Sequence, residues 1–383
     1  MSSCFFLALS LTIGHIWPAS TTSLPVHFPD PALEQAVLEA LANPTQPLTQ
    51  ADLIELEALD LTGRAIHSLE GLQHAVNLKA LRASNNRLSD LSPLRELTAM
   101  ERLVLDHNLI TSLRPLRNMK KLRIFHAVDN QVEDISPMAG WDSIVGITIA
   151  NNRFSSLDPL TGKTTLKALW VPDNRIDDIS ALASLPQLKV LVLGGNPIES
   201  ISNLAGLREM VDLGLFDLAL SDIGVLANMP RLERLNLRNN RIQDLSPLKN
   251  LTKLAWVDLR QNLIRDTEAL AHHPALTRLF LARNFIADIQ PLANLPALQW
   301  LVLDGNQVKS IAPLAELEQL RVVSLTNNSI GIDNWSGTAE VLQQLRSRAH
   351  QVHFAPQTPP SVYAPMPGGK AATDLDVEIL TEQ

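Results

Sequence analysis

The chain has 383 residues, of which 45% are hydrophobic and only 4% are aromatic, so its buried core must be mainly aliphatic. The formal net charge of −8 argues against nucleic acid as the main partner, although it does not describe local patches. The single cysteine, Cys4, excludes a fold held together by intramolecular disulfides.

The N-terminal segment contains an apolar run from Phe5 to Trp17, which is too short to span a bilayer. Small residues from Ala19 to Ser23 suit cleavage by a signal peptidase, so we expect residues 1–22 to be a secretory signal. No Lys or Arg precedes the apolar run, which departs from that pattern, and a retained, buried N-terminus is the alternative.

Residues 28–55 have the pattern of two short helices. Asp30 followed by Pro31 is typical of a helix start, because the carboxylate accepts backbone N–H bonds and proline needs none. Apolar residues then recur at helical spacing, and Thr49 to Asp52 has the form of a capping box for a second helix. We expect this segment to be an N-terminal cap that shields the aliphatic core of the following repeats from water.

Residues 56–335 are built on a 22-residue period, with thirteen copies of one unit and no insertion or deletion between them. The copy from Leu232 to Lys253 reads LERLNLRNNRIQDLSPLKNLTK, which is the spacing of a leucine-rich repeat. In each copy the segment x-L-x-L-x has period two and predicts a short strand with its leucines directed inward. The predicted fold is therefore an α/β leucine-rich-repeat solenoid, curved, with one parallel sheet on its concave face.

An asparagine follows the strand in eleven of the thirteen copies. Its side-chain amide can satisfy backbone groups where the chain turns, so we expect a ladder of structural asparagines. Arg64 replaces it in the first copy and Leu218 in the eighth, which makes the eighth copy irregular. The predicted ladder consists of Asn86, Asn108, Asn130, Asn152, Asn174, Asn196, Asn240, Asn262, Asn284, Asn306 and Asn328.

The rest of each copy returns to the next strand on the convex side. Proline occupies one slot in seven copies, which is typical of the first residue of a helical turn, and the short return predicts one or two turns, often 3-10. After the repeats, residues 336–354 are expected to form a C-terminal cap from a helix and a final strand. Residues 355–383 are rich in proline and end in acidic residues, which predicts a disordered tail.

The motif D-[IL]-S-P-L at 90–94 and 244–248, and its variant at 134–138, resembles the repeats of the bacterial internalins and their secreted relatives. The cap sequence FPDPALEQAVLEAL followed by TQADL is similar to the helical cap of those proteins, and the resemblance covers residues 27–354. It implies a curved solenoid whose concave face binds a protein partner on a host or neighbouring cell. The sequence departs from the family in lacking a cell-wall sorting motif, a following immunoglobulin-like domain and basic surface-binding modules.

Motifs of catalysis are absent from the sequence: there is no phosphate-cradling glycine loop, H-E-x-x-H, G-x-S-x-G or C-x-x-C. The adjacent pair His272 and His273 falls on a convex return, where we expect an exposed linker and not a metal site. We therefore expect a protein that is not an enzyme and that holds no metal and no cofactor.

The outward strand positions are the ones that the repeat leaves free, so a binding function is expected there. Aromatic and arginine side chains gather at these positions in copies 8 to 12, and both types are enriched in binding hot spots. The alternative is that the rings only pack on neighbouring strands and stack with the arginines. The predicted ligand-binding residues are Trp170, Phe216, Arg234, Asn236, Arg238, Trp256, Asp258, Arg260, Arg278, Phe280, Trp300 and Asp304.

Together these features predict a non-catalytic module, secreted or exposed on the cell surface, that binds a protein partner or a glycan on its concave face. Nucleic acid is not an expected partner, and we expect no transmembrane segment in the mature chain. The alternative is a cytoplasmic leucine-rich-repeat scaffold similar to the regulatory subunit of protein phosphatase 1, which has the same 22-residue period. In that case the N-terminal segment would not be cleaved.

Overall fold

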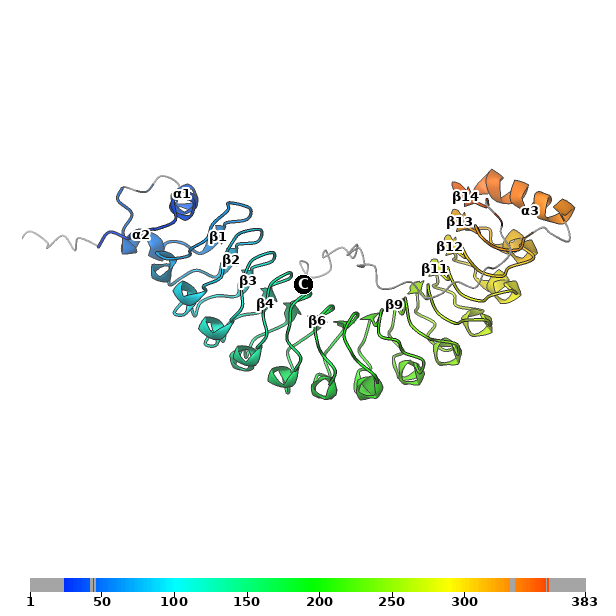
Figure 1. Cartoon of the computed structure of the whole chain (residues 1–383), viewed down its shortest axis with the longest axis horizontal. Helices are drawn as coiled ribbons and strands as arrows, with labels where there is room; N and C mark the ends of the chain where they lie inside the picture. Colours follow the sequence, from blue (N-terminus) through cyan, green and yellow to red (C-terminus); the bar gives the residue numbers. More distant parts are fainter. Residues whose placement is uncertain (1–23, 42–43, 45, 331–334, 356, 358–383) are drawn as a thin grey trace, which may run out of the picture.

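The computed structural model describes residues 24–41, 44, 46–330, 335–355 and 357. They form an arc with the sheet along its inner side and short helical turns along its outer side (Figure 1). This is the leucine-rich-repeat solenoid that the 22-residue period predicts, and the predicted fold class is confirmed. The predicted signal at 1–22 and nearly all of the predicted tail at 355–383 lie outside the described residues.

The inner side is one sheet of fourteen strands that pair in parallel in chain order. Paired residues of the first thirteen strands are 22 positions apart, as with Leu235 and Val257, so the register follows directly from the repeat. The strands are β1 (Ala58–Asp60), β2 (Ala80–Arg82), β3 (Arg102–Val104), β4 (Ile124–His126), β5 (Gly146–Thr148), β6 (Ala168–Trp170), β7 (Val190–Val192), β8 (Asp212–Gly214), β9 (Arg234–Asn236), β10 (Trp256–Asp258), β11 (Arg278–Phe280), β12 (Trp300–Val302), β13 (Val322–Ser324) and β14 (Gln351–His353).

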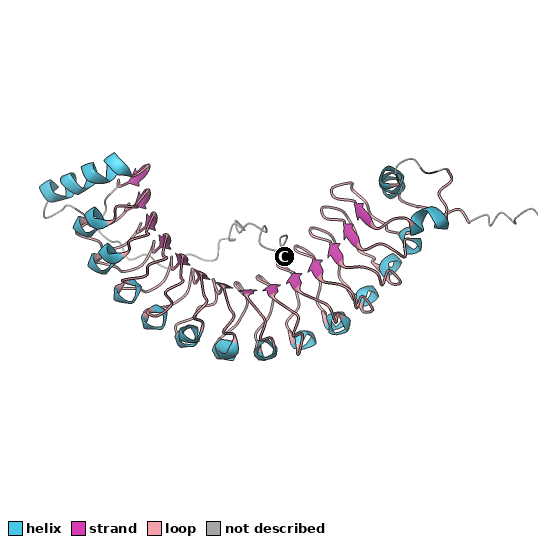
Figure 2. Ribbon diagram, turned by 180° about the vertical axis from the view of Figure 1, so that it is seen from behind, coloured by secondary structure: helices cyan, strands magenta, loops and turns pink. Residues whose placement is uncertain are grey.

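The outer side consists of 3-10 turns of three or five residues, as the short returns predict (Figure 2). Proline is the second residue of many of them, whereas the sequence pattern predicts it as the first; its fixed φ still suits the first helical turn, and its missing N–H needs no partner there. The turns are η1 (Leu72–His74), η2 (Ser92–Leu94), η3 (Arg114–Leu116), η4 (Ser136–Gly140), η5 (Asp158–Leu160), η6 (Ser180–Ser184), η7 (Ser202–Gly206), η8 (Gly224–Asn228), η9 (Ser246–Leu248), η10 (Glu268–Leu270), η11 (Gln290–Asn294) and η12 (Ala312–Glu316).

Longer helices lie at the two ends of the solenoid. α1 (Pro31–Ala40) and α2 (Gln50–Ile54) precede β1, so the predicted helical N-terminal segment is present. α3 (Trp335–Arg348) follows β13 and packs against η12 and β14. Within the described residues, no helix combines the length and the apolar character that a membrane crossing requires.

Asp30 joins the N-terminal helix to the first repeat. Its side chain is 2% exposed, and one carboxylate oxygen accepts the N–H groups of Ala32 and Leu33 at 3.0 and 3.3 Å, which begins α1. The other oxygen accepts the N–H groups of His67 and Ser68 at 2.8 and 3.3 Å. Burial by itself would raise the pKa of Asp30, but these four bonds hold that pKa below its usual value.

The interior of the arc is a continuous column of leucine, isoleucine and valine side chains, most of them fully buried. Three aromatic residues take leucine positions in this column: Phe125, Trp141 and Phe154, each at most 1% exposed. Burial of these apolar side chains is the main stabilising contribution to the solenoid. The outward strand positions take no part in it, which leaves them free to vary.

The asparagines form a ladder beside the strands. All eleven are between 0% and 8% exposed, and each donates its amide N–H to the carbonyl 25 residues earlier, in the preceding copy. The amide oxygen of ten of them accepts the N–H of the residue 20 positions earlier. The amide oxygen of Asn174 is the exception and has no hydrogen-bond partner among the described residues.

The two copies without a ladder asparagine have a different loop. Ala65 in the first copy and Ala219 in the eighth adopt φ angles of 58° and 57°, in the left-handed region that disfavours a residue with a Cβ. Both stand one position after the missing asparagine, at Arg64 and Leu218. Loss of the side-chain amide is therefore accompanied by a changed backbone, which is the physical basis of the irregular eighth copy.

His273 corrects one expectation. Its side chain is 1% exposed, and its ring nitrogens lie 3.0 Å from the Leu270 carbonyl and 3.1 Å from the Leu248 carbonyl, so it is not part of an exposed linker. It fills an inward position that Trp141 fills in the fourth copy, where the indole N–H donates to the Leu116 carbonyl at 2.9 Å. No cluster of His, Cys, Asp and Glu suited to a metal ion occurs within the described ranges.

Candidate binding surface on the concave face

Adjacent strands of the sheet bring together residues that are 22 positions apart in the sequence. The register places Arg234, Trp256, Arg278 and Trp300 side by side on β9 to β12. Neighbouring strands are about 4.8 Å apart, so these side chains form one continuous row. We call the surface made by this row and the neighbouring Arg260 and Phe280 the aromatic–arginine patch; its members are Arg234, Trp256, Arg260, Arg278, Phe280 and Trp300.

The rings of the patch contact one another and the guanidinium groups. The ring centroids of Trp256 and Phe280 are 5.6 Å apart with a 52° tilt. Arg234 lies 5.6 Å from the Trp256 ring, Arg260 lies 5.3 Å from the Phe280 ring, and Arg278 lies 5.7 Å from the Trp300 ring. These contacts are the ones expected if the rings only pack on neighbouring strands and stack with the arginines. Trp300 nevertheless remains 36% exposed, so stacking does not remove its ring from the surface.

Arg234 faces an acidic residue that sequence reasoning missed. Its Nε lies 3.3 Å from a carboxylate oxygen of Asp212, although the two groups are not aligned for a hydrogen bond. Burial raises the pKa of Asp212, and the charge of Arg234 opposes that shift. Asp212 occupies the same position one repeat before Arg234, and the strand register pairs the two residues. The opposite charges 22 positions apart are the sequence feature that could have predicted this contact.

Asp258 corrects the prediction that it belongs to an exposed binding surface. The side chain is 1% exposed and accepts the Nε–H of Arg260 with both oxygens, at 2.9 and 3.0 Å. One oxygen also accepts the Arg260 backbone N–H at 3.0 Å. Arg260 covers the carboxylate and lies over Phe280, so Asp258 acts through its neighbour: it holds the guanidinium in place against the ring.

Phe216 is likewise not part of the exposed surface. It is 9% exposed and lies over Gly194 of the preceding copy, where an added Cβ would overlap its ring. The ring fills the space that the missing side chain leaves. Glycine at the same outward position of the preceding copy is the sequence feature that permits this burial, and it was not used in the prediction.

Two further predicted residues have their side-chain oxygens occupied by neighbouring groups. Asp304 accepts the hydroxyl of Ser324 at 2.7 Å and the backbone N–H of Thr326 at 2.8 Å. Asn236 accepts the backbone N–H of Arg238 at 3.1 Å. Both are half-buried, and these bonds serve the loops that leave the strands.

The other predicted residues differ in position and in charge environment. Trp170 is half-buried on β6, and three strands separate it from β10, so it does not join the patch. Arg238 has a guanidinium nitrogen 3.6 Å from a carboxylate oxygen of Asp217. Arg278 is exposed, and no carboxylate of the described residues lies within 4.0 Å of it. Arg278 is therefore the uncompensated cation of the patch, between Trp256 and Trp300.

The comparisons with known proteins agree with this architecture. A family model described as Leucine Rich repeats (2 copies) matches residues 76–118, 164–206 and 230–272. The solved internalin InlF of Listeria monocytogenes is 31% identical, with a TM-score of 0.81, and the match covers 89% of this chain and all of that chain. A search of curated proteins found no match.

Two more distant structures share the fold. A leucine-rich-repeat protein of Leptospira interrogans is 20% identical with a TM-score of 0.69, covering 79% of this chain and 81% of that one. The ectodomain of the Arabidopsis thaliana receptor kinase GASSHO1/SCHENGEN3 is 22% identical with a TM-score of 0.66, covering 79% and 38%.

The fold thus defines a leucine-rich-repeat protein, a class whose members bind other proteins. More narrowly, the chain belongs to the internalin-like leucine-rich-repeat proteins. This confirms the resemblance seen in the repeat and cap sequences.

Proposed function

We propose that this protein is a secreted or surface-exposed module that binds a protein partner through the aromatic–arginine patch. The observation that carries the proposal is the state of Arg278, which is exposed, has no carboxylate partner among the described residues and stands between two indoles. Three other arginines, Arg234, Arg238 and Arg260, lie beside acidic groups of the same chain. A partner that presents a carboxylate flanked by apolar side chains would complement Arg278, Trp256 and Trp300 together.

Membership in the internalin-like family supports binding as the activity. The plant receptor ectodomain with the same fold was solved in complex with CASPARIAN STRIP INTEGRITY FACTOR 2, which illustrates that such a solenoid serves recognition of another molecule. Export from the cytoplasm rests on the apolar segment between Phe5 and Trp17 and on the family. The mass of the mature N-terminus tests it: a start near residue 23 agrees with export, whereas a retained Met1 favours the cytoplasmic scaffold.

The binding proposal is tested by capture of surface proteins from intact cells on the immobilised full chain. A protein retained by the wild type should be lost with the variant Trp256→Ala/Phe280→Ala/Trp300→Ala, then bind the purified wild type directly. The matched control Val104→Ala/Thr148→Ala changes outward positions of β3 and β5 and should retain it. Equal capture by the patch variant and the wild type would show that the partner binds elsewhere.

The role of Arg278 has its own matched control. Arg278→Glu should abolish capture, because a like charge then faces the carboxylate of the partner. Arg102 occupies the same repeat position on β3 and is also exposed, so Arg102→Glu makes the same charge change on the same face. Loss of capture with both variants would indicate a general charge effect and contradict the assignment to Arg278.

A further inference from the structure

The convex side carries a second charged feature, unrelated to the concave patch. The stretch 79–123 contains ten Lys and Arg but only four Asp and Glu, although the whole chain has 32 of the former and 40 of the latter. Five of these basic residues follow or flank the turns η2 and η3, and all five are exposed. We call them the convex basic surface: Arg95, Arg114, Arg117, Lys120 and Lys121.

These five side chains lack acidic partners. No carboxylate of the described residues lies within 4.0 Å of any of them, in contrast to Lys79, which pairs with Glu57 at 2.7 Å. Arg114 lowers the pKa of Asp134, but to a smaller extent than the N–H and hydroxyl of Ser136 do. The surface is therefore a locally uncompensated positive charge on an acidic protein.

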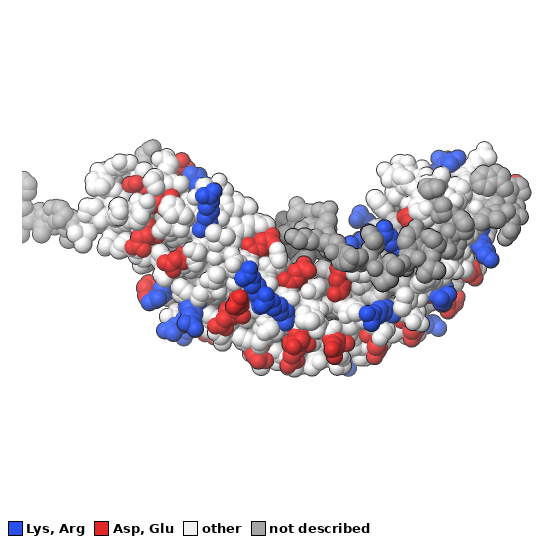
Figure 3. All heavy atoms as spheres, in the orientation of Figure 1, with Lys and Arg blue, Asp and Glu red and all other residues white. Residues whose placement is uncertain are grey.

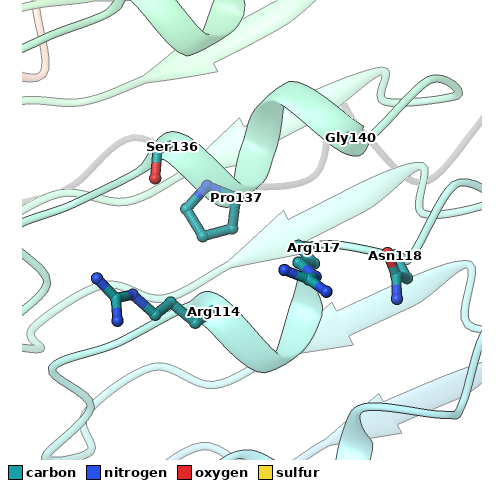
Figure 4. A pocket seen from close by; sticks show the side chains of 6 residues that line it. All are labelled: Arg114, Arg117, Asn118, Ser136, Pro137 and Gly140. Carbon is teal, nitrogen blue, oxygen red and sulfur yellow. The ribbon is translucent and has the colours of Figure 1, made fainter.

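The centre of this surface is a depression of about 450 Å³ between η3 and η4 (Figure 4). One side of the hollow is lined by Arg114 of η3, by Arg117, which directly follows η3, and by Asn118. The other side is lined by Ser136, Pro137 and Gly140 of η4. Gly140 permits the close approach of the two turns, because a Cβ there would overlap the Arg117 carbonyl oxygen. Two arginines and an asparagine thus line one hollow, and its lining residues include no Asp or Glu.

The repeat itself shows that these arginines are not required for the fold. Seven other copies have alanine at the position of Arg117: Ala139, Ala183, Ala205, Ala227, Ala271, Ala293 and Ala315. The position of Arg114 holds serine or another residue without positive charge in the other copies. Arginine at both positions occurs in the third copy alone, so the turn needs neither of them.

A second depression on the convex side has the opposite character. It has a volume of about 470 Å³ between η9 and η10, and its lining includes Asp244, Asp266 and Glu268 with one cation, Lys249. Acidic side chains also recur along the outer rim of the face shown in Figure 3. An anionic ligand would be repelled by the carboxylates of this second hollow, so the hollow between η3 and η4 differs from it in charge.

We propose that the convex basic surface binds an anionic polysaccharide, with a sulfate or phosphate group held between Arg114 and Arg117. Guanidinium groups bind such tetrahedral anions through paired N–H bonds, and Lys120 and Lys121 extend the contact along the chain of sugars. Nucleic acid fits less well, because binding of single strands relies on aromatic stacking. The aromatic residues of these copies, Phe125 and Trp141, are fully buried.

The test measures binding of the full chain to heparin and, separately, to a phosphorylated mannan, at several salt concentrations. Arg114→Ala/Arg117→Ala should weaken binding to the preferred polymer by about tenfold and reduce the salt dependence by about two units of the log–log slope. Lys120→Ala/Lys121→Ala should have a smaller effect in the same direction. Circular dichroism of each variant confirms that the solenoid is intact.

The matched control is Lys249→Ala/Lys253→Ala, which removes two exposed lysines at the repeat positions of Arg117 and Lys121. It should stay within about twofold of the wild type, since those positions contribute no anion site. Preference for heparin identifies sulfate as the bound group, and preference for the mannan identifies phosphate. Absence of binding to both polymers, equal losses in the control, or tighter binding to single-stranded DNA would overturn the proposal.

Discussion

The asparagine ladder and the aromatic–arginine patch follow the same repeat period but differ in what surrounds them. Ladder side chains are at most 8% exposed, and their hydrogen bonds join one copy to the next. The patch lies mainly on the outward face of the strands, whereas the ladder lies in the loops that follow them; Trp300 is 36% exposed, and Arg278 has no acidic partner among the described residues. A repeat protein can therefore keep the residues that hold the fold separate from those that bind within one 22-residue copy.

The largest expected effect comes from removal of one ladder residue. Asn262→Ala leaves the buried Ile242 N–H without its acceptor at 3.0 Å, and it removes one of the two amide donors of the Leu237 carbonyl, of which Asn240 remains. We expect the free energy of unfolding to fall by about 3 kcal/mol, measured by urea denaturation. The control Asn118→Ala, at an exposed position, should change the free energy of unfolding by less than about 0.5 kcal/mol. Similar losses in both variants would contradict a special stabilising role of the ladder asparagines.

Arg260 belongs to the patch and also covers a buried carboxylate. It therefore tests whether the residues that bind are fully separate from those that stabilise the fold. Arg260→Ala leaves Asp258, 1% exposed, without its ion pair. Since Arg260 itself is partly exposed, we expect a loss of about 2 kcal/mol in unfolding free energy, less than for a fully buried pair. The double variant Asp258→Asn/Arg260→Ala should recover most of it, and additive losses in this cycle would contradict the assignment.

A smaller effect of opposite sign is expected where the ladder is interrupted. Ala219 has a φ of 57°, which glycine adopts without strain. Ala219→Gly should raise the free energy of unfolding by about 0.5–1 kcal/mol. The same substitution at Ala227, within the turn η8, should lower it slightly. Destabilisation at both positions would show that the loop at 219 is not strained.

The smallest effect concerns pH. Burial raises the pKa of Asp106, which follows β3, so the folded state holds this proton more tightly than the unfolded state. Stability contributed by the protonated form is therefore lost as pH rises above the unfolded pKa. Asp106→Asn keeps an acceptor for the Val128 N–H, so it should raise the melting temperature at pH 7 and leave it nearly unchanged at pH 3.5.

Asp244 provides a control of opposite sign. Hydrogen bonds from the backbone and hydroxyl of Ser246 lower its pKa, so its contribution is present at neutral pH and lost as pH falls. Asp244→Asn should lower the melting temperature slightly at pH 7, and this effect should shrink as pH falls through the folded pKa, which lies below 3.8. The same pH trend in both variants would contradict the assigned direction of one of the shifts.

The fold could be predicted from the sequence because each inward position recurs with the same residue type. Leu235 and its counterparts in the neighbouring copies give the period, and the period gives the register. The helix start at Asp30 was visible from the following Pro31, but its bonds to the first repeat were not, since they depend on the packing of α1 against that repeat.

The surface was harder to predict, because exposure depends on neighbouring side chains, many of them in the adjacent copy, and not on the residue alone. Phe216 is buried since Gly194 leaves it room, and Asp258 is buried since Arg260 covers it. Arg278 stays uncompensated since the register places Trp256 and Trp300 beside it. Whether the patch binds a partner is a property of that partner as well, which this sequence does not contain.

The most direct test asks whether binding can be lost while the fold is kept. The purified partner is titrated by calorimetry into Trp256→Ala/Phe280→Ala/Trp300→Ala, and the urea unfolding midpoint of the same variant is measured. We predict at least about a hundredfold weaker binding, because three hot-spot side chains are lost together, with a smaller loss of stability than in Asn262→Ala. Unchanged affinity, or weaker binding only because the variant unfolds, would contradict the claim that the outward positions bind while the inward ones hold the fold.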